Sequence, residues 1–235
     1  SLGHTIHLYD IDQDKLKTIQ QKKLPFYESG LEELLIDSLE KGNLKISESL
    51  EKFIKNTNCC FICVGTPSNS NGTIDLQQIE SSIKSIIPSL KQKNKEKYLV
   101  IIRSTVIPST TRSKILPILS SNLRDYFHLA VVPEFLREGK ALSDFMNPDK
   151  IVIGSLDKET NDLVKNIFVH FENKAKFIQT NIETAEMIKY TNNAFLATLI
   201  SFSNEIANIS EEILGVDPFE VMSALIEDKR ITTKI

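Results

Sequence analysis

The sequence predicts a doubly wound α/β fold with a mostly parallel sheet, followed by one long helix. Up to residue 181, short apolar runs typical of strands alternate with stretches that have the amphipathic period of helices. Strands that alternate with helices pair in parallel through right-handed crossover connections. The strand runs are largely apolar at successive positions, as expected where helices cover both faces of a sheet.

The individual elements follow from the same patterns. We expect strands over residues 4–10, 44–46, 59–64, 98–103, 127–132, 151–155 and 175–179. We expect helices over residues 12–21, 31–41, 50–55, 75–91, 110–123 and 158–171. Asp12 is a candidate N-cap of the first helix, Gly42 closes the second, and Pro117 interrupts the fifth.

The pattern changes at residue 182. Residues 182–214 contain neither Pro nor Gly, and the run 194–200 (AFLATLI) is apolar on every face of a helix. A helix that is apolar all round is buried in a core or in an interface. We therefore expect one α/β domain over residues 1–181 and the start of a helical region over residues 182–235, with a shorter helix near its end.

Composition excludes several classes of partner. The chain has 28 basic and 31 acidic residues and no clustered basic segment, which argues against nucleic acid. No apolar run reaches the roughly 18 residues of a membrane span, and residues 1–20 do not resemble a signal peptide. Cys59, Cys60 and Cys63 lie in one apolar run, so we interpret them as small core residues of a protein from the reducing cytoplasm. We predict no metal site.

Polar loops follow four of the expected strands. Asp10 follows the first strand, Thr66 lies in GTP after the third, and Thr105 lies in RSTV after the fourth. The fifth strand is followed by PEFLREG, residues 133–139. Because ligands bind at the carboxyl ends of parallel strands, we expect these loops to form one site.

Each loop residue has a functional and a structural interpretation. Asp10 suits the ribose hydroxyls of NAD and would repel the 2′-phosphate of NADP, but it could equally cap a helix or remain solvated. Thr66 and Thr105 offer one donor and two acceptor sites each, although Thr is also common in turns. Glu134 and Glu138 could divide acid and base work, or could pair with Arg137 between them.

A further pair lies at the start of the long helix. Lys189 and Asn193 are four residues apart, which places them on one helix face. Because the apolar run follows, we expect both to be at least half-buried and to stabilise an oxyanion. The alternative is a structural pair between Lys189 and Glu186 or another acid.

The chain resembles the UDP-glucose/GDP-mannose dehydrogenase family. The resemblance rests on GHTIHLYDID, PFYESGLEELL, FICVGTPSNSNGTID, RSTVIPSTT, PEFLREGKALSDFMNPDKIVIG and AEMIKYTNNAFLATLISFSNEIAN. PEFLREG followed by NPDKIVIG is most similar to the UDP-glucose members. The resemblance implies a Rossmann-like NAD-binding domain over residues 1–181, and a homodimer formed through the helix 182–214. It also implies the four-electron oxidation of UDP-glucose to UDP-glucuronate with NAD.

The resemblance implies the following residue roles. The residues at NAD would be Asp10, Lys15, Thr66, Thr105 and Glu138, with Asp10 and Lys15 on the adenosine ribose. The residues at the substrate would be Glu134, Phe135, Leu136, Arg137, Lys189 and Asn193. The catalytic set would be Thr105, Glu134, Glu138, Lys189 and Asn193, in which Glu134 assists hydrolysis of a thioester and the last two stabilise oxyanions.

Two parts of the family pattern are not matched. The glycine fingerprint and the first strand are expected before residue 1, and the nucleophilic cysteine is expected in a segment beyond residue 235. We therefore expect the chain to be truncated at both ends and to be inactive by itself. Alternatives are a GDP-mannose 6-dehydrogenase, a β-hydroxyacid dehydrogenase that removes one hydride, or a fragment that serves only in dimerisation or nucleotide binding.

Overall fold

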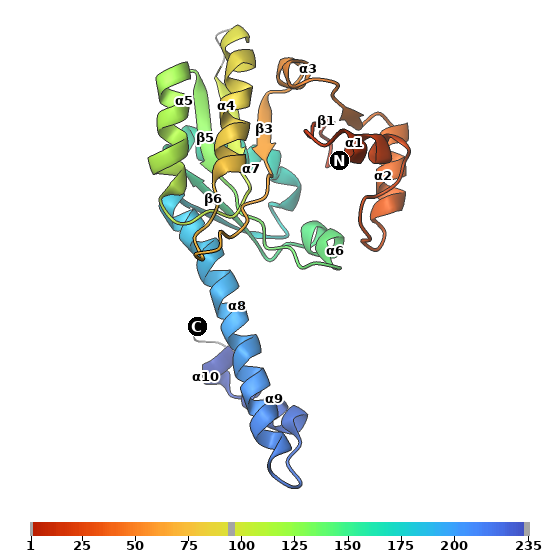
Figure 1. Cartoon of the computed structure of the whole chain (residues 1–235), viewed down its shortest axis with the longest axis vertical. Coiled ribbons are helices and arrows are strands. Elements are labelled where there is room, and N and C mark those ends of the chain that lie inside the picture. Colours follow the sequence, from red (N-terminus) through yellow and green to blue (C-terminus); the bar gives the residue numbers. More distant parts are fainter. Residues whose placement is uncertain (1, 94–96, 233–235) are drawn as a thin grey trace. The chain divides into compact units, whose positions relative to one another are not determined.

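The computed structural model of the chain describes residues 2–93 and 97–232 (Figure 1). The chain divides into two compact units, Ser1–Lys189 and Tyr190–Ile235. The strands of the first unit are β1 (Ile6–Leu8), β2 (Leu44–Ile46), β3 (Cys59–Ile62), β4 (Tyr98–Ile102), β5 (Phe127–Val131), β6 (Lys150–Ser155) and β7 (Lys176–Asn181).

The helices confirm most of the predicted elements. Those that begin in the first unit are α1 (Gln13–Gln20), α2 (Leu31–Glu40), α3 (Leu50–Lys55), α4 (Gln77–Gln92), the π-helix η1 (Thr111–Ile115), α5 (Leu116–Leu123), α6 (Ala141–Met146), α7 (Lys158–Ile167), the 3-10 helix η2 (Val169–Phe171) and α8 (Ile182–Glu211). The second unit adds α9 (Pro218–Ile226) and α10 (Lys229–Thr232).

The main sheet has the strand order β3-β4-β5-β6-β7 and is parallel except between β5 and β6. Strands β1 and β2 form a separate parallel pair. The loop after β5 and the short helix α6 keep the chain at the edge of the sheet where β5 ends. Strand β6 therefore starts at that edge and runs antiparallel to β5. The prediction of a doubly wound, mostly parallel sheet is confirmed.

The core lies on both faces of the inner strand β4, whose five residues are all buried. Val100 and Ile102 pack in one cluster with apolar residues of α4 and α5. Leu99 and Ile101, which point to the opposite face, pack in a second cluster with residues of α7. Because successive side chains of a strand alternate between faces, a continuously apolar strand requires helices on both sides.

Local signals fix several helix ends. Asp12 accepts hydrogen bonds from the backbone N–H of Asp14 and Lys15 at 3.0 and 3.1 Å, which confirms it as the cap of α1. Pro117 lies in the first turn of α5, where its missing N–H costs no helical hydrogen bond, and the turn before it winds as the π-helix η1.

The first two turns of α8 pack within the first unit. Ile182 and Ala185 are fully buried in its core. A Cβ atom on Gly154 of β6 would lie 2.5 Å from the Cβ of Ala185, so glycine is needed for this close approach. Glu186 accepts hydrogen bonds from the N–H groups of Ser109 at 2.6 Å and of Thr111 at 2.9 Å, which fixes α8 to the segment after β4.

The second unit presents apolar side chains on its surface. Phe195, Leu199 and Ile200 are 40%, 43% and 63% exposed. Asn193 is also exposed, contrary to the expectation that it is at least half-buried, because none of the residues that the structure describes covers its face of α8. Among the described residues, α8 and the other helices lack the combination of length and apolar character needed to cross a membrane.

Candidate active site

The loops after β3 and β4 are joined by the two predicted threonines. The Thr66 hydroxyl donates a hydrogen bond to the backbone carbonyl of Thr105 at 2.7 Å. The Ser104 hydroxyl donates to the carbonyl of Val64 at 2.6 Å. These bonds give donors to backbone carbonyl groups that lie beyond the last hydrogen bonds between the strands. They also hold the two loops together at the carboxyl edge of the sheet.

Arg103 joins the loop after β5 to the same edge. Its Nη1 donates to the carbonyl oxygens of Val132 and Pro133 at 3.1 and 3.3 Å. These carbonyls immediately precede Glu134, and burial lowers the pKa of Arg103 from its ordinary value. Arg103 was not among the predicted site residues, although a cation at the end of a buried strand is a signal for such a role.

The centre of the site is an ion pair between Glu134 and Lys189. Nζ of Lys189 donates to Oε1 of Glu134 at 2.9 Å, and the Lys189 side chain is 7% exposed against 31% for Glu134. The other carboxylate oxygen, Oε2, accepts the backbone N–H of Leu136 at 2.6 Å. Lys189 is buried, as expected, and in this structure it makes the alternative interaction, a pair with an acid, which is the predicted site residue Glu134.

The surroundings keep the Glu134 carboxylate ionised. Burial raises its pKa, but the hydrogen bonds from Lys189 and from the Leu136 N–H outweigh burial, helped by the positive charges of Lys189 and Arg103. The net result is a pKa below the ordinary value of a glutamate. Near neutral pH the site therefore holds an anionic acceptor beside a buried ammonium donor.

The rest of PEFLREG forms the rim of the site. The Phe135 ring lies beneath two ammonium groups, at 4.6 Å from Nζ of Lys150 and 5.4 Å from Nζ of Lys189. Arg137 pairs with Asp144 of α6 through three hydrogen bonds of 2.6 to 2.9 Å, and these bonds lower the pKa of Asp144 to about 2. Glu138 is exposed.

The observed ion pairs differ from the alternative interpretation, in which the two glutamates pair with Arg137. Arg137 makes its ion pair with Asp144, and Glu134 makes its pair with Lys189. The acid that pairs with Lys189 is Glu134 and not Glu186, because both Glu186 carboxylate oxygens accept backbone N–H groups near η1.

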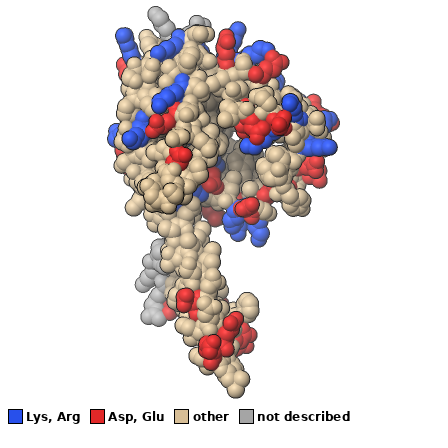
Figure 2. All heavy atoms as spheres, viewed as in Figure 1, with Lys and Arg blue, Asp and Glu red and all other residues tan. Residues whose placement is uncertain are grey.

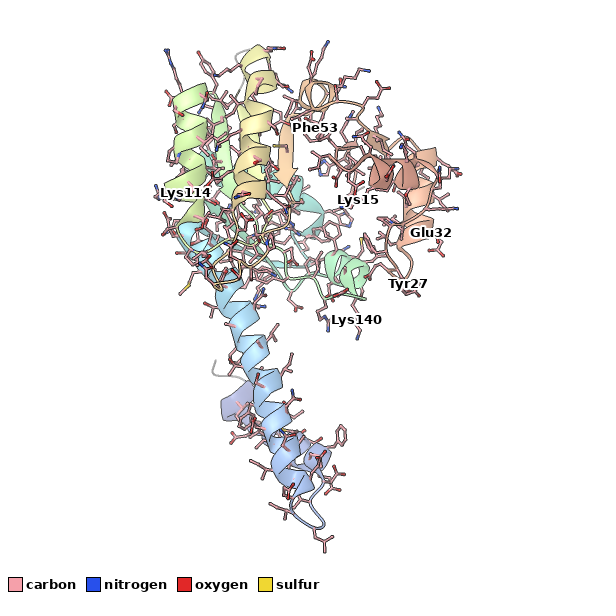
Figure 3. All side chains as sticks on the ribbon, viewed as in Figure 1. Lys15, Tyr27, Glu32, Phe53, Lys114 and Lys140 are labelled. Carbon is pink, nitrogen blue, oxygen red and sulfur yellow. The ribbon has the colours of Figure 1, made fainter. Side chains whose placement is uncertain are left out.

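Asp10 and Lys15 lie at the end of β1 and on α1, where Lys15 is labelled in Figure 3. Oδ1 of Asp10 accepts the N–H of Asp12 at 2.9 Å, which orients the carboxylate in a local turn. Nζ of Lys15 is 3.8 Å from Asp12. A carboxylate offers about four lone-pair sites, so the turn hydrogen bond leaves acceptor capacity for ribose hydroxyls.

The loop before α2 connects this part of the unit to the rim. Glu28 is buried, and its carboxylate accepts the N–H of Leu142 in α6 at 3.4 Å. Figure 3 labels Tyr27 in the same loop and Lys140 at the start of α6. Charged residues of both signs alternate over the face of the first unit shown in Figure 2.

The three cysteines differ in burial: Cys60 is buried, Cys59 is partly buried and Cys63 is exposed. Burial raises the pKa of all three thiols, most strongly for Cys60, which is fully buried. A high pKa keeps a thiol in its weakly nucleophilic protonated form. The interpretation as a core residue is therefore confirmed for Cys60, whereas it is wrong for Cys63, whose side chain is exposed.

Two family models match the chain. Residues 1–172 match the NAD binding domain of the UDP-glucose/GDP-mannose dehydrogenase family, and residues 183–235 match its central domain. The chain belongs to this family. The predicted resemblance is confirmed, and the α/β unit contains the family's NAD-binding domain.

Relatives with two different substrates are similar to the chain. It is 39% identical over 233 residues to the UDP-glucose 6-dehydrogenase of Rickettsia bellii, covering 99% of this chain and 52% of that protein. It is 37% identical over 233 residues to the GDP-mannose 6-dehydrogenase of Pseudomonas aeruginosa, covering 97% and 52%. The crystal structure of a ternary complex of GDP-mannose dehydrogenase from Pseudomonas aeruginosa has a TM-score of 0.91 over 97% of this chain and 52% of that one, at 37% identity. The chain therefore spans about half the length of these relatives.

Proposed function

We propose that this chain supplies the NAD-binding and hydride-transfer half of a nucleotide-sugar 6-dehydrogenase that oxidises UDP-glucose to UDP-glucuronate. The observation that carries the proposal is the Glu134–Lys189 pair, 2.9 Å across, beside the loops joined by Thr66 and Thr105. We assign residues 1–181 to the NAD-binding domain and residues 182–235 to the start of the central dimerisation domain.

The polar residues that follow the strands suit NAD. Asp10 at the end of β1 would accept the ribose hydroxyls, with Lys15 beside it on α1. Thr66, Thr105 and Glu138 would border the nicotinamide end. When bound, NAD accepts the hydride that leaves C6 of the sugar.

The ion pair explains how the protein would assist this chemistry. As C6 loses its hydride, negative charge develops on the sugar oxygen, and a buried ammonium is a strong donor to such an oxyanion. Lys189 would supply this donor, with Asn193 as a further one on the same helix. Glu134, held ionised, would accept a proton from the water that completes the oxidation, with Thr105 helping to place that water. The backbone of Phe135, Leu136 and Arg137 would lie along the substrate.

Counting NADH per sugar tests the reaction. We expect the full-length protein to form two NADH per UDP-glucose. We expect the 235-residue chain alone to form none, because it spans only 52% of the relatives that are named for this activity. One NADH per substrate would support the β-hydroxyacid alternative. Turnover by the short chain would refute the proposed division of the site.

Matched variants test the site itself. Lys189→Ala and Glu134→Gln should each lower kcat by at least about tenfold, as is typical when an oxyanion donor or a general base is lost. Lys165→Ala is a suitable control, because Lys165 is half-buried and pairs with Glu172 away from the site. Equal activity of all three variants would contradict the assignment.

The preference for UDP-glucose over GDP-mannose rests on PEFLREG followed by NPDKIVIG. Comparing kcat/KM for the two sugars in the full-length protein tests it, and a higher value for GDP-mannose would replace this proposal with the alternative.

We also propose that a second copy covers the apolar part of α8. The run 194–203 carries no charge, and Phe195 and Leu199 are exposed in the single chain. An exposed apolar helix face of this kind marks an interface. Phe195→Glu and Leu199→Glu should convert a dimer into a monomer in light scattering, and an unchanged mass in both variants would count against this interface.

A further inference from the structure

His128, Asp157 and Glu159 meet far from the sheet edge that carries the dehydrogenase residues. His128 is the second residue of β5, and the two acids lie at the start of α7. One potential ligand atom from each residue lies within 4.8 Å of the others. Because β6 runs antiparallel to β5, the chain after β6 returns alongside the beginning of β5 and places α7 there.

A chain of hydrogen bonds determines which nitrogen of His128 carries the proton. The Thr160 hydroxyl donates to Oδ2 of Asp157 at 3.1 Å, and the Thr160 N–H donates to Oδ1 at 2.8 Å. The hydroxyl proton of Thr160 is thus used, so its oxygen accepts the hydrogen bond from Nδ1 of His128 at 2.9 Å. Nδ1 then carries the proton, and the lone pair of a neutral His128 is on Nε2.

The lone pair on Nε2 faces another acceptor. Oε1 of Glu159 lies 3.9 Å from Nε2. A cation between two acceptors that face each other binds to both lone pairs at once. Zinc bonds to imidazole nitrogen and carboxylate oxygen are about 2.0–2.2 Å long, so one ion can bridge 3.9 Å with the two bonds at a wide angle.

The remaining features fit an ion rather than an apolar contact. His128 is buried, so its ring is held in place, and Thr160, which orients it, is fully buried. A histidine ligand whose second nitrogen is fixed by a hydrogen bond is a common arrangement at metal sites. Asp157 and Glu159 supply two negative charges, against one positive charge from Lys97, whose Nζ is 3.6 Å from Oε2 of Glu159.

We propose that His128, Asp157 and Glu159 bind a divalent first-row metal ion of the zinc type. Imidazole with carboxylates favours such ions over the harder magnesium and calcium, which prefer oxygen ligands alone. His128 and Glu159 are the principal ligands, and Asp157 contributes a remaining lone pair while it caps α7. The ion would tie α7 to β5 and leaves the dehydrogenase residues at the opposite edge untouched.

Calorimetric titration of the metal-free full chain with Zn²⁺ tests the site. We expect one binding event that His128→Gln and Glu159→Gln each weaken by at least about tenfold. Lys97→Met should strengthen binding, because it removes a competing cation. Glu172→Gln, which removes an exposed carboxylate elsewhere, should leave the affinity unchanged. Mg²⁺ in place of Zn²⁺ should bind much more weakly.

NMR of the histidine side chains supplies a second measurement. The chain has four histidines, so the imidazole signals can be assigned individually. Without metal, His128 should show a proton on Nδ1, and Zn²⁺ should shift its Nε2 signal selectively. If His128→Gln does not fold, the exposed Glu159 still decides the matter. Absence of Zn²⁺ binding, or binding that both substitutions leave unchanged, overturns the proposal.

Discussion

Replacing Gly154 with alanine should destabilise the first unit through α8. The added Cβ would lie 2.5 Å from the Cβ of Ala185 and 2.7 Å from the carbonyl oxygen of Asn181. Carbon atoms in good contact are about 3.5–4.0 Å apart, so the start of α8 must move by about 1 Å. Overpacking of this kind costs about 1–3 kcal/mol. The upper half of that range applies, because backbone atoms at the start of α8 cannot turn aside.

Urea unfolding followed by circular dichroism measures the effect. A loss of about 2–3 kcal/mol corresponds to a fall in Tm of roughly 4–12 °C for a chain of this size. Gly65→Ala is the matched control, because the nearest atom to its added Cβ is Oε1 of Gln78 at an ordinary 3.5 Å. We expect that control to stay within about 0.5 kcal/mol of the parent. A Gly154→Ala variant as stable as the control would refute the argument from close packing.

Three further substitutions are predicted to act in distinct ways. The pKa of Glu134 is lowered in the folded protein, so its carboxylate stabilises the fold above the ordinary pKa of 4.5, and this contribution is lost as pH falls through the folded pKa. The difference in unfolding free energy between the parent and Glu134→Gln should therefore shrink on acidification. Burial raises the pKa of Glu186, so its contribution to the unfolding free energy is fullest below pH 4.5 and is lost as pH rises through the folded pKa. In the same urea series, the difference in unfolding free energy between the parent and Glu186→Gln should therefore change with pH in the opposite direction. Arg103→Met should lower the unfolding free energy by about 1–3 kcal/mol, because it leaves two carbonyl oxygens without their donor, and Arg103→Lys should recover part of this loss. Equal unfolding midpoints for the parent and Arg103→Met would contradict this.

The sequence predicted most of the helices and strands, but it did not predict the direction of β6 or the presence of α6. Apolar runs locate strands well, and β4 lies within one residue of its expected span. The same runs carry no information about strand direction, so the antiparallel β6 was not foreseen as such. Helix α6 was missed because it has six residues and none is buried, which leaves no periodic pattern to detect.

The candidate site shows the same limit. Spacing alone indicated that Lys189 is buried and needs a partner. It did not identify Glu134, which is 55 residues away and reaches Lys189 only through tertiary packing. Arg137 was likewise expected beside a glutamate, whereas α6 brings Asp144 to it. Residue types at strand ends thus predict where a site lies, and packing determines which charges pair within it.

The start of α8 makes the site depend on packing at a distance from the chemistry. Gly154 sets how closely the helix approaches β6, Glu186 attaches it to the segment after β4, and Lys189 attaches it to the loop after β5. These three residues act on one rigid element, since each lies on the first two turns of α8 or directly against them. A shift of about 1 Å at Gly154 should therefore be transmitted to the 2.9 Å contact between Lys189 and Glu134. Gly154→Ala should accordingly lower kcat in the full-length protein under conditions where it remains folded, although Gly154 makes no contact with the ion pair.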